Sequence, residues 1–555
     1  MKNNRTWLSI SLFCCKSEWN RLFANGVIPF ITANDLLEAY TIEFNYTGGE
    51  NIRLSLLTNR TNINELTKKA GEHFKAWFLK ASPVTTEVSL SEEEDALFPA
   101  NPVQFGLYPA LEIVTEEKEN YSLSISLSQI ILGALKEEVI DDETILTFAF
   151  YLTMCLIKVI SSIHPGFINS LKPVFQPSAP SQAGNEVTAM EPEEIEAVNA
   201  LIMDRITLNQ KFEEYKAGLI EITGDVMNSV NETDMLGWLK QWLNTCKTEL
   251  NKPGENGDII TTYKRIIETV YRNLGITAET NSQLYYFVQR VLGLMNPADI
   301  IIMGVQKCGT STLHYTLTAH SNISGPVEPG NNKPVKEVNF FGFIPNWKKG
   351  MDWYFSHFVG SKGLFLDSSP NYITAPLYYG RLKMIMPDAK LIICLRDPVK
   401  RAYSHYNHYK QILPESEKWD WKYDQDFLTN IKTDLLSIQN YLDNGHSDLD
   451  SVTPFAGLVL RGVYISQIKQ LLAYYDRSQI YITISDRWPQ NYQSELDNIQ
   501  AFLGLEKETL PPRIANKREY EEPINEEAKQ LLIEFYKPYN QELFEFLGYE
   551  IPEWN

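Results

Sequence analysis

The chain has 555 residues, with 50 Lys and Arg against 70 Asp and Glu, which gives a formal net charge of −20. Its length allows roughly two to four domains, and its apolar content of 44% is typical of globular proteins. The negative charge argues against general binding to nucleic acids or to an anionic membrane, both of which need a basic surface, but it permits a local basic site.

The N-terminal residues predict a strand and not a secretory signal. Apolar and polar residues alternate in WLSISLF (7–13), and no small-residue cleavage site follows. The most apolar window, 145–157, is shorter than the roughly 20 residues that span a bilayer, so it predicts a buried helix. Six scattered cysteines without a CxxC or zinc spacing indicate reduced thiols. We therefore expect a soluble, cytoplasmic protein with no membrane or nucleic-acid partner.

The first 171 residues mix strands and helices. YTIEFNY (40–46) and NIRLSLLT (51–58) alternate in polarity, and TGGE between them predicts a hairpin. Helical patterns follow at 63–80, 125–137 and 145–160.

The middle of the chain changes in composition. Residues 173–194 are rich in Pro, Ser, Gly and Glu, which predicts a linker or mobile loop. From residue 193 to about 295 the pattern is nearly all helical. We expect an α+β domain with a helical second half over 1–295.

The remaining residues, 296–555, alternate between strand and helix patterns. A strand–loop–helix unit begins at Asp299, and apolar runs recur at 363–369, 389–396 and 479–485. Such alternation predicts an α/β domain with a parallel sheet covered by helices.

The loop of the first strand–loop–helix unit has the composition of an anion site. It reads GVQKCGTSTL (304–313), and Gly304 and Gly309 flank four residues. A glycine-rich turn before a helix directs backbone N–H groups and the helix dipole at one point, where oxyanions bind. Thr310 stands where a Walker loop has its lysine, and Lys307 lies inside the loop instead. A nucleotide kinase is therefore disfavoured, and we expect no metal site.

Four motifs in order make residues 298–554 resemble the sulfotransferases that use 3′-phosphoadenosine 5′-phosphosulfate (PAPS), especially the heparan-sulfate and bacterial branch. The first is the loop itself, which resembles the family's 5′-phosphosulfate loop. The others are KEVNFF (336–341), SPNYI (369–373) with Asp367 two residues before it, and RDPVKRAYS (396–404). The resemblance implies a P-loop-like parallel sheet, PAPS as co-substrate and adenosine 3′,5′-bisphosphate as product.

The resemblance also implies a set of cofactor-binding residues. A ligand with phosphate groups at both ends of adenosine needs two anion sites, and Arg396 and Ser404 are donors suited to the 3′-phosphate. The alternative for Arg396 and Arg401 is a surface ion pair, and for Lys517 and Arg518 it is a solvated charge pair. The expected cofactor-binding residues are Gly304, Gln306, Lys307, Cys308, Gly309, Thr310, Ser311, Thr312, Arg396, Ser404, Lys517 and Arg518.

Three residues are expected to be catalytic. Sulfuryl transfer is an in-line displacement, so catalysis is chiefly positioning and charge stabilisation. Glu337 is the candidate base, Lys307 would neutralise the leaving oxygen, and Lys336 would stabilise the transferring group and keep the carboxylate ionised. Asn339 replaces a frequent histidine of the family, which leaves proton removal to Glu337. The alternative is an exposed Lys–Glu pair before a buried strand.

Residues 1–295 resemble, more weakly, the C-terminal domain of lantibiotic dehydratases, also called the thiopeptide-type bacteriocin biosynthesis domain. The resemblance rests on WLSISLF, RLFANGVIPFI, GENIRLSLL and IETVYRNLG. Asn51 and Glu268 replace the family's histidines, Ser55 replaces an arginine, and Arg53 is kept. We therefore expect a degenerate elimination domain that does not eliminate glutamate but binds a ribosomally made peptide. An unrelated α+β domain is the alternative.

Other patterns are expected to be structural. His405 and His408 have a metal-compatible helical spacing without a third ligand, so solvated or packing histidines are favoured. The aromatic-rich 347–358 is expected to be core, with the floor of an acceptor site as the alternative.

Two functions are consistent with these patterns. The favoured one is transfer of a sulfuryl group from PAPS to a hydroxyl acceptor on a peptide natural product. The alternative is a non-catalytic peptide-recognition or scaffold protein with a vestigial nucleotide site. Tyrosine, serine, sugar and lipid hydroxyls all satisfy the donor side, and neither the acceptor nor the oligomeric state is readable from the sequence.

Overall fold

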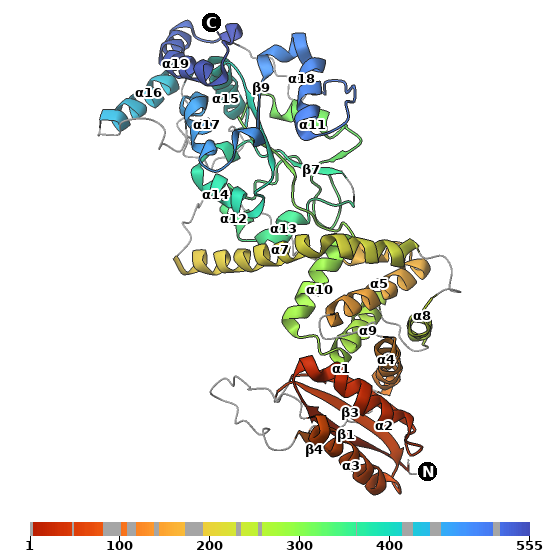
Figure 1. Cartoon of the computed structure of the whole chain (residues 1–555). Coiled ribbons are helices and arrows are strands. Elements are labelled where there is room, and N and C mark those ends of the chain that lie inside the picture. Colours follow the sequence, from red (N-terminus) through yellow and green to blue (C-terminus); the bar gives the residue numbers. More distant parts are fainter. Residues whose placement is uncertain are drawn as a thin grey trace. The chain divides into compact units, whose positions relative to one another are not determined.

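The computed structural model divides the chain into two compact units (Figure 1). Unit 1 comprises Met1–Leu171 with Glu214–Val291, and unit 2 comprises Lys172–Glu213 with Leu292–Asn555. The residues that the structure describes are 4–46, 49–81, 102–107, 118–137, 144–172, 192–228, 235–252, 258–361, 363–412, 426–443, 457–513 and 522–554.

Unit 1 contains a four-stranded antiparallel sheet in the order β2-β3-β1-β4. The predicted N-terminal strand and hairpin are confirmed, since Asn45 at the end of one strand pairs with Asn51 at the start of the next. The strands are β1 (Arg5–Phe13), β2 (Ala39–Asn45), β3 (Asn51–Asn59) and β4 (Val103–Phe105).

The apolar face of this sheet is covered by a helix at 63–81, which was predicted, and by short helices between Trp19 and Thr32, which were not. The ring centroid of Trp19 lies 4.9 Å from that of Phe44, and the ring of Phe30 lies 5.1 Å from that of Phe74. Gly26 and Pro29 suggest that no helix runs through this segment. Pro29, however, stands in the first turn of its helix, where its missing N–H costs nothing. The covering elements are α1 (Trp19–Leu22), the π-helical η2 (Phe23–Val27), α2 (Ile28–Thr32) and α3 (Ile63–Ala81).

The other described elements of unit 1 are helices, as predicted. Asn273 on α9 donates its amide to the carbonyl of Ile42 over 3.0 Å, and the N–H of Ile42 donates to Ser128 on α4 over 2.8 Å. These bonds satisfy backbone groups of the edge strand β2 that would otherwise be open. The helices are α4 (Lys118–Lys136), α5 (Ile145–Ile163), α6 (Phe167–Ser170), α8 (Gly237–Leu250), α9 (Ile259–Asn273) and α10 (Ala278–Val291).

Helix α5 is the predicted apolar helix. Among the described residues it alone is long and apolar enough to cross a membrane, and 67% of its most apolar window is buried inside the structure. Trp242 donates its indole N–H to the carbonyl of Leu152 on this helix over 3.0 Å. The prediction of a buried helix is confirmed.

The last residues of the predicted linker are helical. Residues 173–191 lie outside the described residues, but 192–194 form the first turn of α7 (Pro192–Asn228). The proline at 192 was read as part of the linker because proline disfavours the interior of a helix. It is well tolerated at the first position of a helix, which is where it stands in α7.

Unit 2 contains the predicted parallel sheet, in the order β6-β7-β5-β8-β9. Its central strands are continuous apolar runs because both of their faces are buried. Only the two-residue β6 was not predicted. The strands are β5 (Ile300–Gly304), β6 (Ile323–Ser324), β7 (Leu364–Asp367), β8 (Lys390–Leu395) and β9 (Ile480–Ile484).

Helices alternate with these strands along the chain. One apolar cluster joins α15, α16 and α19, with Ile431, Leu532 and Tyr536 fully buried within it. The helices are α11 (Thr310–Leu317), α12 (Ile344–Trp347), α13 (Gly350–Phe355), α14 (Pro376–Ile385), α15 (Pro398–Ile412), α16 (Phe427–Asp443), α17 (Tyr464–Leu472), α18 (Trp488–Leu503) and α19 (Glu526–Leu547).

The strand order places a topological switch point beside β5. The chain passes from β5 to β6 and β7 on one side and then to β8 on the other. In open α/β sheets ligands bind outside the carboxyl ends of the strands at such a point. A ligand site is therefore expected at the loop that follows β5 and the residues that follow β8.

Candidate functional site

The glycine-rich loop connects β5 directly to α11. The N–H of Cys308 donates to the carbonyl of Val305 over 3.1 Å, and the N–H of Leu313 donates to Gly309 over 3.1 Å as α11 begins. Lys307 at the loop's crest has a φ of 74°. The predicted hydroxyl residues Thr310, Ser311 and Thr312 thus form the first turn of the helix, as expected for an anion-binding helix N-terminus.

Two positions in this loop require glycine. A Cβ on Gly304 would lie 2.5 Å from Ile373 Cγ2, and a Cβ on Gly309 would lie 2.8 Å from Trp488 Cζ3. Gly309 also has a φ of 88°, which side-chain-bearing residues rarely adopt. The indole of Trp488 donates to Thr483 over 2.9 Å, so this ring cannot move away without losing a bond.

Replacing Gly309 with alanine is expected to disrupt the loop. The added methyl combines steric overlap with an unfavourable φ, so we expect affinity for adenosine 3′,5′-bisphosphate to fall at least about tenfold. Calorimetric titration measures this affinity. Gly504→Ala is the matched control, because Gly504 also has a positive φ (76°) but no atom lies within 4 Å of the place that its added methyl would take. Equal losses in both variants would contradict a specific role for the loop.

Arg396 follows β8 and contacts the loop. Its Nη1 donates to the carbonyl oxygen of Lys307 over 3.4 Å, and its own carbonyl accepts the hydroxyl of Tyr464 over 2.7 Å. The same hydroxyl lies 3.6 Å from Cys308 Sγ. The predicted residues Lys307 and Arg396 are therefore neighbours.

Cys308 is fully buried beneath the loop. Burial raises the pKa of its thiol to about 11, although the charges of Arg401 and Arg396 act in the opposite direction. The side chain is therefore a neutral packing group, and its N–H is used within the loop.

The structure adds an arginine that the sequence analysis missed. Arg461, in the 3₁₀ turn η7 (Leu460–Gly462), donates to Gln306 over 2.5 Å and to Asn371 over 3.2 Å. It links the loop after β5 to the segment after β7. The available signal was its place in the apolar run GLVLRGVYI, because a buried arginine needs specific acceptors.

The alternative interpretation of Arg401 as a member of a surface ion pair is wrong. Arg401 is 0% exposed and donates to the carbonyl of Leu458 and to Nδ1 of His405. Burial and the charge of Arg401 lower the pKa of His405, so this histidine is neutral and packs in the core, as predicted. Ser404, the other predicted 3′-phosphate ligand, is also buried on α15.

Lys336 and Glu337 form an ion pair, with 2.5 Å between Nζ and Oε1. Their side chains are 16% and 35% exposed, so the pair is neither a core contact nor fully solvated. The pKa of His314 on α11 is lowered to about 4. Burial is the main cause, and the charge of Lys336 is the second. Lys336 therefore lies near the helix that the glycine-rich loop opens.

The neighbouring aromatic segment is core, as predicted. Phe340 is stacked on Tyr354 with 4.7 Å between ring centroids, and Trp347 lies 5.1 Å from Phe340. All three rings are buried. Lys517 and Arg518 lie outside the described residues.

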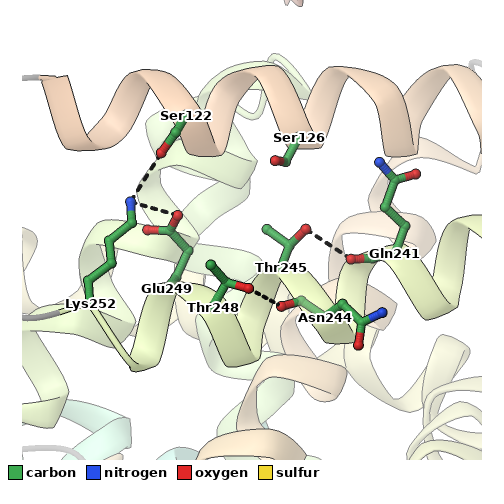
Figure 2. Close-up of a pocket in the computed structure, with 8 residues that line it drawn as sticks. All are labelled: Ser122, Ser126, Gln241, Asn244, Thr245, Thr248, Glu249 and Lys252. Carbon is green, nitrogen blue, oxygen red and sulfur yellow. Dashed lines mark hydrogen bonds and ion pairs between the residues drawn. The ribbon is translucent and has the colours of Figure 1, made fainter.

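Unit 1 contains a separate polar groove of about 460 Å³ between α4 and α8 (Figure 2). Lys252 contacts Ser122 over 3.1 Å and Glu249 over 2.7 Å. Thr245 and Thr248 donate to carbonyls of their own helix, as Figure 2 shows. Because these groups are satisfied internally, the groove does not resemble an anion site.

The residues that carry the N-terminal resemblance divide between surface and core. Glu268 and Arg272 are exposed on α9, and Asn273 is buried in the contact with β2 described above. Arg53 pairs in register with Glu43 on β2. Burial raises the pKa of Glu43, and the charges of Arg272 and Arg53 oppose that shift.

The C-terminal part of the chain matches a known family. Residues 297–540 match the sulfotransferase domain. The bifunctional heparan sulfate N-deacetylase/N-sulfotransferase 1 of Caenorhabditis elegans is 36% identical over 211 residues, which are 37% of this chain and 22% of the relative. The chain thus spans about a fifth of the length of this relative, and the same share of the human bifunctional heparan sulfate N-deacetylase/N-sulfotransferase 2, which is 26% identical over 211 residues.

Two solved structures are similar in part. The sulfotransferase from Alicyclobacillus acidocaldarius is 22% identical, with coverage of 47% of this chain and 99% of that chain and a TM-score of 0.36. The pyridine synthase TbtD from thiomuracin biosynthesis is 13% identical, with coverage of 51% and 96% and a TM-score of 0.37. At these TM-scores neither likeness supports an argument.

The family match rests on the same segment in which the parallel sheet, the glycine-rich loop and Arg396 were found. Residues 297–540 of this chain match the sulfotransferase domain family.

Proposed function

We propose that residues 296–555 bind PAPS and transfer its sulfuryl group to a hydroxyl or amine acceptor. The observation that carries this proposal is the contact of Arg396 with the carbonyl of Lys307, which puts a guanidinium beside the glycine-rich loop. In a chain of net charge −20, cationic side chains gather at the carboxyl end of the sheet. They are Lys307, Lys336, Arg396, Arg401 and Arg461.

This arrangement suits a ligand with anionic groups at both ends of a nucleoside. The loop and the N-terminus of α11 offer backbone N–H groups and hydroxyls to a 5′-phosphosulfate. Arg396 and Ser404, on the other side of the switch point, are the donors proposed for the 3′-phosphate. A divalent metal is not required for such a donor, because Lys307 can neutralise the charge that develops on the leaving oxygen.

The proposed reaction is one in-line displacement. The acceptor oxygen or nitrogen forms a bond to sulfur, and the bond from sulfur to the bridging phosphate oxygen breaks. The electron pair of that bond leaves with adenosine 3′,5′-bisphosphate, and the acceptor's proton passes to the Glu337 carboxylate. The proposed role of Lys336, 2.5 Å from that carboxylate, is to stabilise the transferring group.

We also propose that the protein is cytoplasmic and that unit 1 recognises the acceptor, a ribosomally made peptide. The buried position of Asn273 supports a structural role for the last of the motifs in unit 1 and not a catalytic one. If the site of unit 2 is vestigial, the chain is instead a peptide-recognition protein.

The test is transfer from ³⁵S-labelled PAPS together with calorimetry. We expect the full chain to bind adenosine 3′,5′-bisphosphate and to label one class among peptide, sugar and amine acceptors, or to release labelled sulfate slowly to water. Binding without any release or transfer would favour the scaffold function. Absence of binding would refute the nucleotide site itself.

A further inference from the structure

Two successive backbone N–H groups beside the Lys336–Glu337 pair are linked through hydroxyls to one buried carboxylate, Asp367. The backbone N–H of Val338 lowers the pKa of Asp367. The N–H of Asn339 donates to the hydroxyl of Ser369 over 3.0 Å, and that hydroxyl donates to Asp367 over 2.7 Å. The N–H of Phe340 donates to the hydroxyl of Tyr372 over 2.8 Å, and that hydroxyl donates to Asp367 over 3.0 Å.

The carboxylate itself cannot reach a substrate. Asp367 is the last residue of β7 and is 0% exposed. Its third hydroxyl donor is Tyr354 on α13, whose hydroxyl lies 3.0 Å from Oδ2. A buried anion that accepts three hydroxyl donors is well satisfied, so its function has to be exerted through the groups that it holds.

The segment that it holds has an unfavourable backbone conformation. Asn339 has a φ of 51°, in the left-handed region that few non-glycine residues adopt. The consecutive N–H groups of Asn339 and Phe340 are accepted by the hydroxyls of Ser369 and Tyr372, which Asp367 holds in turn. The peptide that leads into this segment belongs to Glu337, so the direction of the Glu337 side chain depends on these bonds.

We propose that Asp367 is a positioning residue: with Ser369 and Tyr372 it fixes the backbone of residues 338–340 and so the placement of the Lys336–Glu337 pair. This inference rests on the proposed function for its catalytic consequence only. The hydrogen-bond network can be tested whether or not the chain transfers a sulfuryl group.

Two tyrosines give a matched pair of variants. Tyr354 and Tyr372 are both buried and both donate to Asp367 Oδ2 over 3.0 Å, but only Tyr372 also accepts a backbone N–H of the segment. Tyr372→Phe and Asp367→Asn are expected to speed amide exchange at residues 338–340 by at least about tenfold, and Tyr354→Phe by less than about threefold. Ser369→Ala, a small change, serves if either larger variant fails to fold.

The same variants are compared in turnover. With release of ³⁵S-sulfate from PAPS to water as the readout, Tyr372→Phe and Asp367→Asn should lower the rate at saturating PAPS at least about tenfold. The Kd of adenosine 3′,5′-bisphosphate should stay within about threefold of the wild-type value, because the loop after β5 is untouched. Tyr354→Phe should keep most of the rate.

The pH dependence separates positioning from stability. Burial raises the pKa of Asp367 from 3.8 to about 6, against the opposing effect of its hydrogen bonds. The titratable groups that face it, Tyr354 on α13 and Tyr372 on η4 (Tyr372–Thr374), both have pKa values raised well above 10.0 and stay neutral. Protonation of Asp367 replaces an acceptor by a donor, so the rate should fall as the pH drops through about 6. The Asp367→Asn variant should not show this fall in rate near pH 6.

Stability should change in the opposite direction. Because the folded pKa of Asp367 lies above the unfolded one, its ionisation opposes folding, and its contribution to stability increases as the pH falls from 7 toward 4. The wild type should therefore gain Tm relative to Asp367→Asn at pH 5 while it loses rate.

The outcomes are distinct. Faster exchange at 338–340 with a loss of turnover in Tyr372→Phe, but not in Tyr354→Phe, supports the proposal. Unchanged exchange in Asp367→Asn, or equal turnover losses in the two tyrosine variants, overturns it. If the variants show the expected changes in amide exchange but the wild-type chain neither releases nor transfers sulfate under any condition, the proposed function is refuted and the hydrogen-bond network is still established.

Discussion

Substitution of Glu337 by glutamine is expected to lower sulfuryl transfer by about 10² to 10⁴-fold, the usual contribution of a general base. Glutamine has nearly the same shape but cannot take the acceptor's proton. The carboxylate is 35% exposed and lies 2.5 Å from Lys336, so the side chain reaches solvent beside a cation. The Kd of adenosine 3′,5′-bisphosphate should change by less than about threefold, since Glu337 is not among the donors proposed for either phosphate. Labelled transfer and calorimetry measure the two quantities separately.

Glu506→Gln is a suitable control for this variant. Glu506 is an exposed carboxylate that follows α18, near Phe502, whose carbonyl accepts Lys390 at the start of β8. It therefore lies toward the opposite end of the parallel strands, and its substitution should leave transfer and binding unchanged. Equal losses of transfer and of nucleotide binding in Glu337→Gln would show that the carboxylate serves the fold or the nucleotide and not proton removal.

Substitution of Lys307 by methionine is expected to lower transfer by about 10² to 10³-fold, as the removal of one preorganised charge-stabilising donor does in other enzymes. Methionine keeps the length of the side chain and removes its charge. Lys307 is held at the crest of the loop with a φ of 74°, and its carbonyl accepts Arg396. Because its charge matters most when the bridging oxygen leaves, the rate constant at saturating PAPS should fall more than the affinity for adenosine 3′,5′-bisphosphate.

Lys400→Met makes the same chemical change at the same end of the sheet. Lys400 is half exposed on α15 and is paired with Asp397 over 3.1 Å and with Asp486 over 3.9 Å. Its charge is already balanced, so this variant should retain transfer within about threefold. If Lys400→Met lost as much activity as Lys307→Met, the general positive potential of this edge would explain both effects, and a specific role for Lys307 would be refuted.

Much of the fold follows from local patterns. The alternating strands of unit 1 and the continuous apolar strands of unit 2 were both predicted, because a half-buried strand has a period of two and a strand buried on both faces has none. The short helices between Trp19 and Thr32 were not predicted. They are stabilised by packing of rings such as Trp19 on Phe44, a contact between segments that no local window contains.

The candidate site divides in the same way. The residues of the glycine-rich loop, the Lys336–Glu337 pair and Arg396 were found from short motifs, since each depends on a fixed spacing along the chain. The roles of Arg461 and Asp367 were not found, because each acts on segments distant in sequence. Arg461 donates to Gln306, and Asp367 accepts the hydroxyls of Ser369 and Tyr372, which hold the N–H groups of Asn339 and Phe340.

The sequence by itself determined the two-part organisation of secondary structure, the parallel sheet and the identity of the loop that follows its first strand. Only the tertiary structure decided which charges are buried and what each of them holds. Arg401, for which a surface ion pair was the alternative, is enclosed and donates to Leu458, and Asp367 is enclosed and accepts three hydroxyls. The physical reason is that periodicity reports which face of an element is buried, whereas the partner of a buried charge is set by segments that meet only when the chain has folded.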